Sequence, residues 1–253
     1  MKIRISAVLS ILLLVCLCLS LSAFAEEDTS IIDVIPAPPA EDWSAPTVFV
    51  GSSMMFGSYE QNGNLYDGPE PIEWLVLDIR GDDALLISRW CLTGQRFNTT
   101  YAKATWETSP LRAWLNGEFL TSAFSDTERQ QIRLTWVDNS QSQSNPSWTS
   151  ANTGADTQDS VFLLSWAEAE RYFGSDEARK TYMTQAAGTQ KYQEAGVNAW
   201  WWLRSMGKSN LGVSIVRGNG TMTSQHINED TGGVRPVIWI HIEQQTPAEE
   251  IIY

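Results

Sequence analysis

Hydrophobic and polar residues form two C-terminal patterns that predict β-strands. Residues 199–205 read Ala-Trp-Trp-Trp-Leu-Arg-Ser, and residues 232–240 form a second apolar run that also contains one arginine. Aromatic and β-branched residues of this kind favour strands. Alternate side chains of a strand point to opposite faces, so Trp202 and Arg204 share one face while Trp201 lies on the other. Because both faces carry large apolar groups, we expect a central strand, covered on both sides and partnered by 232–240.

Turn signals complete this strand pattern at both ends of the chain. Residues 212–227 read as a hairpin, and Gly218-Asn219-Gly220 supplies the residues that tolerate positive φ in a tight turn. Residues 73–79 and 84–90 are also strand-like, with a predicted turn between them at 80–83. The sequence therefore predicts a mainly antiparallel, twisted sheet built from both ends of the domain.

Helix signals lie between these strands. Ser109-Pro110 places a capping residue before a proline at the first helical position, and the apolar residues that follow recur at helical spacing. Capping-box sequences begin at Ser125 and Ser165, and the second box follows an apolar run at 161–164 that predicts a buried strand. Two to three short helices between strands indicate a single α+β domain rather than a βαβ repeat.

A long polar segment, residues 138–159, shows no hydrophobic period and predicts a surface loop. Trp136 and Trp148 bracket its polar residues, and an exposed indole beside Asn, Gln and Asp is what the binding of a sugar ring requires. Long loops of this type are often functional. We therefore predict that this loop and the loop 225–231 approach a ligand, with these contacts: Trp148, Trp136, Asn139, Asn228, Glu229 and Asp230. Trp148 in particular is expected to be exposed.

Other conspicuous residues have structural interpretations. Arg204 and Arg235 each lie within an apolar strand, where a guanidinium usually needs a carboxylate or backbone carbonyls. An ion pair or carbonyl clamp is the expected role, and a hook for an anionic ligand is the alternative. Trp201, Trp202 and Trp239 are predicted to be core residues.

Composition adds the cellular context. Met1–Ala25 has the charged, apolar and Ala-Phe-Ala order of a secretory signal, with a retained anchor as the alternative. Residues 26–47 are an acidic, proline-rich linker, residues 48–243 the folded domain, and residues 244–253 a tail. Cleavage leaves 15 basic against 30 acidic residues, a charge that disfavours nucleic acid and anionic lipid as partners. We expect a secreted or cell-surface protein without a membrane span after cleavage.

Several motifs in order support a resemblance. The sequences FGSYEQ, IEWLVLD, ALLISRW, LRAWLN and DSVFLLS, followed by WWLRS and GVRPVIWI, resemble the family known as domain of unknown function 6273. The resemblance covers roughly residues 55–240. The ending of that family is similar to formylglycine-generating-enzyme-type and C-type-lectin-like domains, which implies a C-type-lectin-like fold by analogy. No catalytic residues follow from the resemblance.

Candidate chemistry is sparse. Cys91 is the only cysteine left after cleavage, and His226 and His241 are its only possible imidazole partners. A buried structural thiol is the competing interpretation. No cofactor is expected, although oxygen ligands in the Asn228–Asp230 loop and at Asp156 and Asp159 would suit calcium. A calcium site and a solvated acidic loop both stay open.

These observations favour a binding module without catalytic activity, whose ligand is an extracellular glycan or protein. Two alternatives remain. One is an enzyme of the formylglycine-generating type or with another cleft chemistry, although such oxidases use a cysteine pair and the mature chain has one cysteine. The other is a structural component of a cell envelope.

Overall fold

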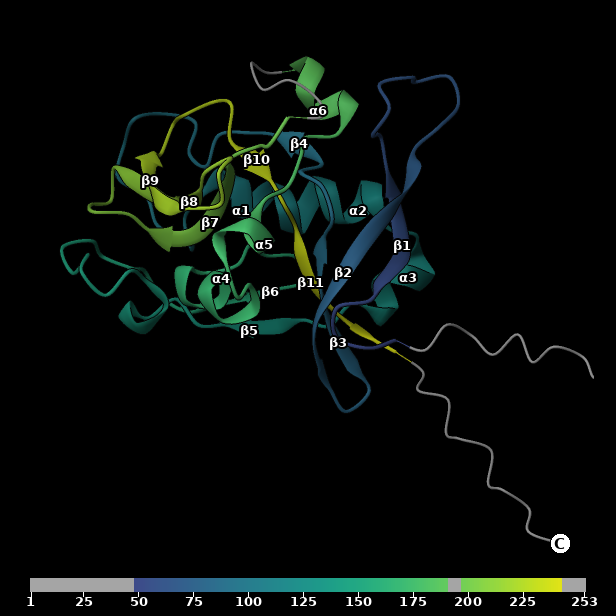
Figure 1. Cartoon of the computed structure of the whole chain (residues 1–253), viewed down its shortest axis with the longest axis horizontal. Coiled ribbons are helices and arrows are strands. Elements are labelled where there is room, and N and C mark those ends of the chain that lie inside the picture. Colours follow the sequence, from purple (N-terminus) through teal and green to yellow (C-terminus); the bar gives the residue numbers. More distant parts are fainter. Residues whose placement is uncertain (1–47, 191–196, 243–253) are drawn as a thin grey trace, which may run out of the picture. The chain divides into compact units, whose positions relative to one another are not determined.

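The tryptophan-rich strand β7 (Trp201–Met206) lies at the centre of the second of two main sheets (Figure 1). The computed structural model describes residues 48–190 and 197–242, which belong to one compact unit. All six residues of β7 are buried, as the apolar character of both its faces predicts. The predicted signal segment, the linker and the tail at 244–253 lie outside the described residues.

The first sheet has the order β1-β2-β3-β11 and is antiparallel throughout. Its strands are β1 (Ser53–Tyr59), β2 (Glu70–Arg80), β3 (Asp83–Ser88) and β11 (Val237–His241). The turn between β2 and β3 contains Gly81 at a φ of 58°, a left-handed conformation that favours glycine. The predicted pair of strands at 73–79 and 84–90 is thus confirmed.

The second sheet has the order β4-β10-β7-β8-β9. Its other strands are β4 (Thr93–Gly94), β10 (Gly233–Val234), β8 (Gly212–Val216) and β9 (Met222–His226). The predicted hairpin is confirmed, because β8 and β9 pair antiparallel through a turn in which Gly220 has a φ of 87°. Figure 1 shows the two sheets on opposite sides of the domain, with β4 and β10 near the top.

The predicted partnership between β7 and the whole run 232–240 is wrong in part. Only β10 joins β7, and it does so in parallel through the pair Gly233 and Trp201. The run divides at Pro236, which has no backbone N–H to donate to a ladder. Beyond this proline the chain crosses to the first sheet and pairs with β3.

Helices connect the sheets, and more of them are present than the two or three predicted. A continuous helical run contains α1 (Pro110–Trp114), the π-helical turn η1 (Leu115–Phe119) and α2 (Leu120–Ala123). The others are α3 (Asp126–Gln131), η2 (Gln141–Gln143), α4 (Trp166–Tyr172), α5 (Asp176–Arg179) and α6 (Gln185–Gln190). All three predicted N-caps are confirmed by side-chain hydrogen bonds, at Ser109, Ser125 and Ser165.

The predicted surface loop 138–159 contains structure that its composition conceals. Its end forms β6 (Thr157–Asp159), which pairs with β5 (Thr135–Val137) as a two-stranded ribbon. The run 161–164 that follows is buried, as predicted, but is not a strand. Its backbone contacts β11 only through the bridge between Phe162 and Val237.

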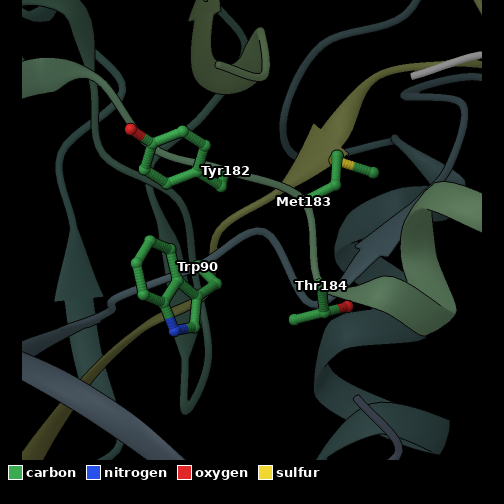
Figure 2. Close-up of a pocket in the computed structure, with 4 residues that line it drawn as sticks. All are labelled: Trp90, Tyr182, Met183 and Thr184. Carbon is green, nitrogen blue, oxygen red and sulfur yellow. The ribbon is translucent and has the colours of Figure 1, made fainter. Parts of the chain in front are cut away.

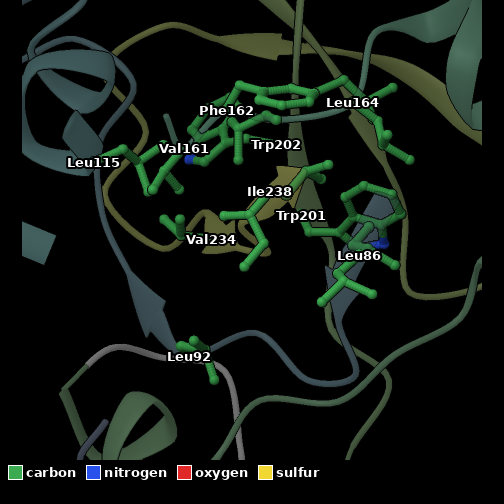
Figure 3. Packing of buried hydrophobic residues seen from close by; sticks show 14 of the residues in the cluster. Leu86, Leu92, Leu115, Val161, Phe162, Leu164, Trp201, Trp202, Val234 and Ile238 are labelled. Carbon is green, nitrogen blue, oxygen red and sulfur yellow. The ribbon is translucent and has the colours of Figure 1, made fainter. Parts of the chain in front are cut away.

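Side chains from both sheets meet in one core. Figure 3 shows residues of β3, β7, β10, β11 and the segment 161–164 converging, among them Leu86, Phe162, Trp201, Trp202 and Ile238. Burial of an apolar surface of this kind contributes roughly 25 cal/mol per Å². Within residues 48–190 and 197–242, no helix is long and apolar enough to cross a membrane.

Candidate functional site

The candidate site is built on two chain segments held side by side at the β4–β10 edge. The backbone N–H of Leu92 donates to the carbonyl of Val234 at 3.0 Å, and that of Gln95 donates to Gly232 at 2.9 Å. The N–H of Asn98 continues the pairing with the carbonyl of Ile227 at 2.8 Å. The loop before β10 and the segment after β4 therefore form a single scaffold.

Buried aromatic residues pack against the inner side of this scaffold. Phe97 is fully buried and its ring lies 6.0 Å from that of Trp202, while the Trp202 indole donates to the Gln95 carbonyl at 2.8 Å. Gly232 lies directly against the same indole, because a Cβ there would stand 1.9 Å from Trp202 Nε1. Phe97 thus points inward, and its neighbour Arg96 is directed to the surface.

Ile227 anchors the loop that carries the acidic residues. Its side chain is fully buried, and its N–H donates to the carbonyl of Leu211 at 3.1 Å. A turn follows, in which the N–H of Glu229 donates to the carbonyl of His226 at 3.2 Å. Residues 228–230 are half-buried, so a fixed loop presents amide and carboxylate groups at the surface.

These elements enclose a pocket of about 380 Å³, here called the polar pocket, lined by Arg96, Tyr101, His226, Asn228, Glu229 and Asp230. The Tyr101 side chain is 54% exposed and its ring lies edge-on to His226, with 5.3 Å between centroids. Arg96 Nη2 lies 3.4 Å from Asp230 Oδ2. The pocket therefore offers an aromatic ring beside hydrogen-bond donors and acceptors.

Three of the predicted ligand contacts lie together in this pocket, namely Asn228, Glu229 and Asp230. Arg96, Tyr101 and His226 were not predicted as contacts. Arg96 and Tyr101 lie about 130 residues before the 228–230 loop in sequence, and the backbone pairing that ends with Asn98 and Ile227 brings them to it. His226 lies at the start of the loop itself. One local signal was present, because the order Arg96-Phe97-Asn98 is that of an extended segment with its apolar residue inward.

Trp136 lies elsewhere, on the outer face of the β5–β6 ribbon. Its side chain is 65% exposed, and its cross-strand neighbour is Gln158, which is also exposed. Leu134, which directly precedes β5, is exposed to the same extent. This face therefore carries an accessible indole beside an amide, although it forms no part of the polar pocket.

Asn139, one of the predicted ligand contacts, lies almost entirely within the protein. The residue is 6% exposed, and its amide nitrogen donates to the carbonyl of Ala155 at 3.0 Å. Its amide oxygen accepts from Arg204 Nε at 3.3 Å. Both ends of the amide are thus engaged within the protein, so Asn139 positions Arg204 rather than facing solvent.

Trp148 also differs from its prediction, because it is half-buried rather than exposed. Its ring lies edge-on to that of Trp166, with 5.0 Å between centroids. The Gln141 side chain donates to the Trp148 carbonyl at 3.1 Å and holds the loop in place. The sequence neighbours of Trp148 are polar and gave no sign of this contact, because Trp166 lies 18 residues further along the chain.

The two strand arginines have distinct environments. Arg204 is 2% exposed and forms a bidentate ion pair with Glu168, in which Nη2 lies 2.9 Å from Oε1. It also donates to the carbonyls of Leu163 and Asp138 at 2.8 and 2.9 Å. Arg204 therefore joins β7 to α4 and to the start of the long loop.

Arg235 is held mainly by aromatic faces. Its Nε donates to the carbonyl of Ser88 at 2.7 Å, and its guanidinium carbon lies 5.1 Å from the Trp201 ring centroid and 5.4 Å from that of Phe173. Burial lowers the pKa of Arg235 to about 10. Trp239 is 9% exposed and lies beneath the guanidinium of Arg80.

Cys91 is a free, fully buried cysteine that does not line the polar pocket. Burial raises the pKa of its thiol to about 12, with a smaller opposing effect from Arg235. The thiol is therefore protonated near neutral pH, whereas a nucleophilic cysteine acts as the thiolate. His226 lies in the polar pocket, and His241 Nδ1 lies 2.9 Å from Arg133 Nη2.

No group of three or more His, Cys, Asp or Glu side chains is placed to hold a metal ion among residues 48–190 and 197–242. Of the carboxylates considered for calcium, Asp159 is fully buried and accepts from Trp106 and Arg112 at 2.9 and 2.6 Å. Asp156 accepts from the N–H of Asn139 at 2.8 Å. These two carboxylates hold the β5–β6 ribbon and the adjoining loop.

Comparison with known proteins gives one match. Residues 81–242 match the family described as domain of unknown function (DUF6273). No curated protein and no solved structure matches the chain at a significant level.

Proposed function

We propose that the chain, which belongs to the DUF6273 family, is a secreted or cell-surface module that binds an extracellular glycan in the polar pocket. The observation that carries the proposal is the position of Tyr101, whose exposed ring stands beside amide and carboxylate groups around one hollow. Sugar rings present C–H faces that stack on aromatic rings and hydroxyls that require polar partners. The pocket offers both kinds of contact within about 380 Å³.

Burial and hydrogen bonding support a preorganised site. The side chains of Asn228 and Glu229 have no hydrogen-bond partner among the residues described, while their backbone is fixed by Ile227 and by the turn at His226. Polar groups on a rigid loop bind without a large cost in ordering. The pocket volume lies within the usual range for small-ligand sites.

The proposal also includes a C-type-lectin-like fold and export. Strands from the two ends of the domain, β3 and β11, pair in one sheet, while the loops of interest extend from the second sheet and the ribbon. Export rests on the predicted signal segment, residues 1–25. Two alternatives remain if no glycan binds. One is a protein ligand in the same pocket, and the other is a structural role in the cell envelope.

A glycan array with the mature protein, followed by calorimetric titration of the best oligosaccharide, tests the proposal. We expect Tyr101→Ala to weaken binding by roughly 2- to 12-fold, because one stacked ring is worth about 0.5–1.5 kcal/mol. Tyr66→Ala is the matched control, since Tyr66 is also exposed but lies on the β1–β2 loop. Equal affinity in both variants, or no binding to any glycan, would contradict the proposal.

A further inference from the structure

A second hollow, here called the aromatic pocket, lies at the start of the same chain segment. It has a volume of about 270 Å³ and is lined by Trp90, Tyr182, Met183 and Thr184. Figure 2 shows the Trp90 and Tyr182 rings as neighbours on one side of the hollow; their centroids are 5.5 Å apart, with 51° between the ring planes. This pocket shares no lining residue with the polar pocket.

Backbone pairing makes the walls of the aromatic pocket rigid. The N–H of Cys91 donates to the carbonyl of Tyr182 at 2.9 Å, and the N–H of Thr184 donates to the carbonyl of Cys91 at 3.1 Å. The Ser88 hydroxyl also donates to the Trp90 carbonyl at 2.7 Å. The backbone at both aromatic residues is therefore held in place by hydrogen bonds.

The lining selects an apolar occupant. Two ring faces and the Met183 side chain make up most of the pocket, and the Thr184 hydroxyl already accepts from the N–H of Ala187 at 3.3 Å. A sugar ring would lose hydrogen bonds to water here without gaining equivalents. The volume suits one aromatic or branched aliphatic side chain.

Charged residues at the rim of the aromatic pocket bear on which charge a bound partner would carry beside its apolar group. The Arg89 guanidinium carbon lies 5.2 Å from the Trp90 ring centroid, and its side chain is 41% exposed even though Nη1 lies 3.2 Å from Glu73. Lys180 lies two residues before Tyr182 on an extended stretch; its side chain is 27% exposed, and its Nζ lies 2.5 Å from Glu177 Oε2. The Trp90 indole N–H has no hydrogen-bond partner among the residues described. The rim thus presents three donors, two of them cationic, in a protein that is otherwise strongly acidic.

We propose that the aromatic pocket binds one hydrophobic side chain of an acidic peptide segment from a partner protein. The side chain enters the hollow and packs against the exposed surfaces of Trp90, Tyr182 and Met183, and flanking carboxylates accept from Arg89, Lys180 and the Trp90 indole. Cations beside an apolar hollow give such a segment its orientation and its preference over a basic one. This site is independent of glycan binding in the polar pocket.

Nuclear magnetic resonance tests the proposal with the full mature chain, because the Trp90 indole N–H signal reports directly on the pocket. Trp90→Phe assigns that signal. The probes are three acetylated and amidated peptides, Gly-Glu-Phe-Glu-Gly, Gly-Glu-Ala-Glu-Gly and Gly-Lys-Phe-Lys-Gly. We expect the first to shift the signal in a saturable manner, the second not to shift it, and the third to bind at least 3-fold more weakly.

Two variants separate the contributions. Tyr182→Ala should weaken binding of the first peptide at least 5-fold. Arg89→Gln should remove most of the difference in affinity between the peptides with acidic and basic flanks. Tyr66→Ala, an exposed tyrosine outside the pocket, should leave binding unchanged. The proposal is overturned if no peptide shifts the Trp90 signal, if the alanine peptide binds equally well, or if N-acetylglucosamine oligomers shift the signal and the peptides do not.

Discussion

Two polar loops of similar composition have opposite structural roles. In the loop 226–231, Ile227 provides the anchor, and the side chains of Asn228 and Glu229 are left to face the polar pocket. In the loop 138–156, Asn139 and Trp148 are themselves the anchors, through Arg204 and Trp166. The difference shows that a polar loop can bind a ligand when a few apolar or backbone contacts hold it and its polar groups stay unused.

The largest expected effect concerns the anchor of the long loop. Arg204→Ala should lower the free energy of unfolding by about 3–5 kcal/mol, because it leaves Glu168 and two buried carbonyls without their partner. Urea unfolding followed by tryptophan fluorescence measures this loss. If the variant is as stable as the parent but no longer binds ligand, the result would instead support the alternative in which Arg204 binds an anionic ligand.

Trp148→Ala provides a smaller test on the same loop. The ring is half-buried against Trp166, so we expect a loss of about 1–2 kcal/mol in stability. Ligand affinity should stay within error of the parent. An unchanged melting curve combined with weaker glycan binding would restore Trp148 as a binding platform.

Alkaline pH tests the rigidity of the scaffold, since Cys91 lies at the start of the segment that reaches the polar pocket. Burial raises the pKa of its thiol to about 12, whereas an unfolded cysteine titrates near 8.5. Between these values the unfolded chain binds fewer protons, so stability falls as pH rises. Above pH 10 the lowered pKa of Arg235 acts in the opposite direction.

We therefore expect the parent to lose about 1–2 kcal/mol more than Cys91→Ala between pH 8 and pH 10. Chemical unfolding of both proteins at the two pH values measures the difference. Identical pH dependence would show that the thiol is accessible in the folded protein, and the segment would then be less rigid than its hydrogen bonds indicate.

The smallest effect is expected at Trp136. Its side chain is 65% exposed, so Trp136→Ala should change the free energy of unfolding by less than about 0.5 kcal/mol. It should also leave binding in the polar pocket unchanged. A loss of glycan affinity in this variant would place the site, or a second part of it, on the β5–β6 ribbon.

Local signals predicted much of the fold. Period-two patterns located β2, β3 and β7, and capping residues located α1, α3 and α4, because these features depend on neighbouring residues. Two exceptions have clear causes. Pro236 divided a run that its apolar composition presented as one strand, and α5 and α6, at four and six residues, are too short to show a helical period.

The candidate site was predicted only in part, because its residues meet through contacts distant in sequence. Composition indicated the 225–231 loop as polar, and its residues Asn228, Glu229 and Asp230 line the polar pocket. Nothing local connects Tyr101 to that loop, since the link is a backbone hydrogen bond from Asn98 to Ile227. Trp148 was misjudged for the same reason, as its neighbours in sequence are polar and its partner Trp166 is remote.

One matched pair of variants tests the central claim most directly. Asn228→Ala and Asn139→Ala remove the same side chain from the two loops, and each variant is measured by urea unfolding and by titration with the oligosaccharide selected on the glycan array. We predict that Asn228→Ala keeps its stability within about 0.5 kcal/mol and binds several-fold more weakly. Asn139→Ala should lose about 1–3 kcal/mol of stability, from the groups left unpaired, and bind normally while folded. The reverse pattern, with weaker binding in Asn139→Ala and normal binding in Asn228→Ala, would contradict the account.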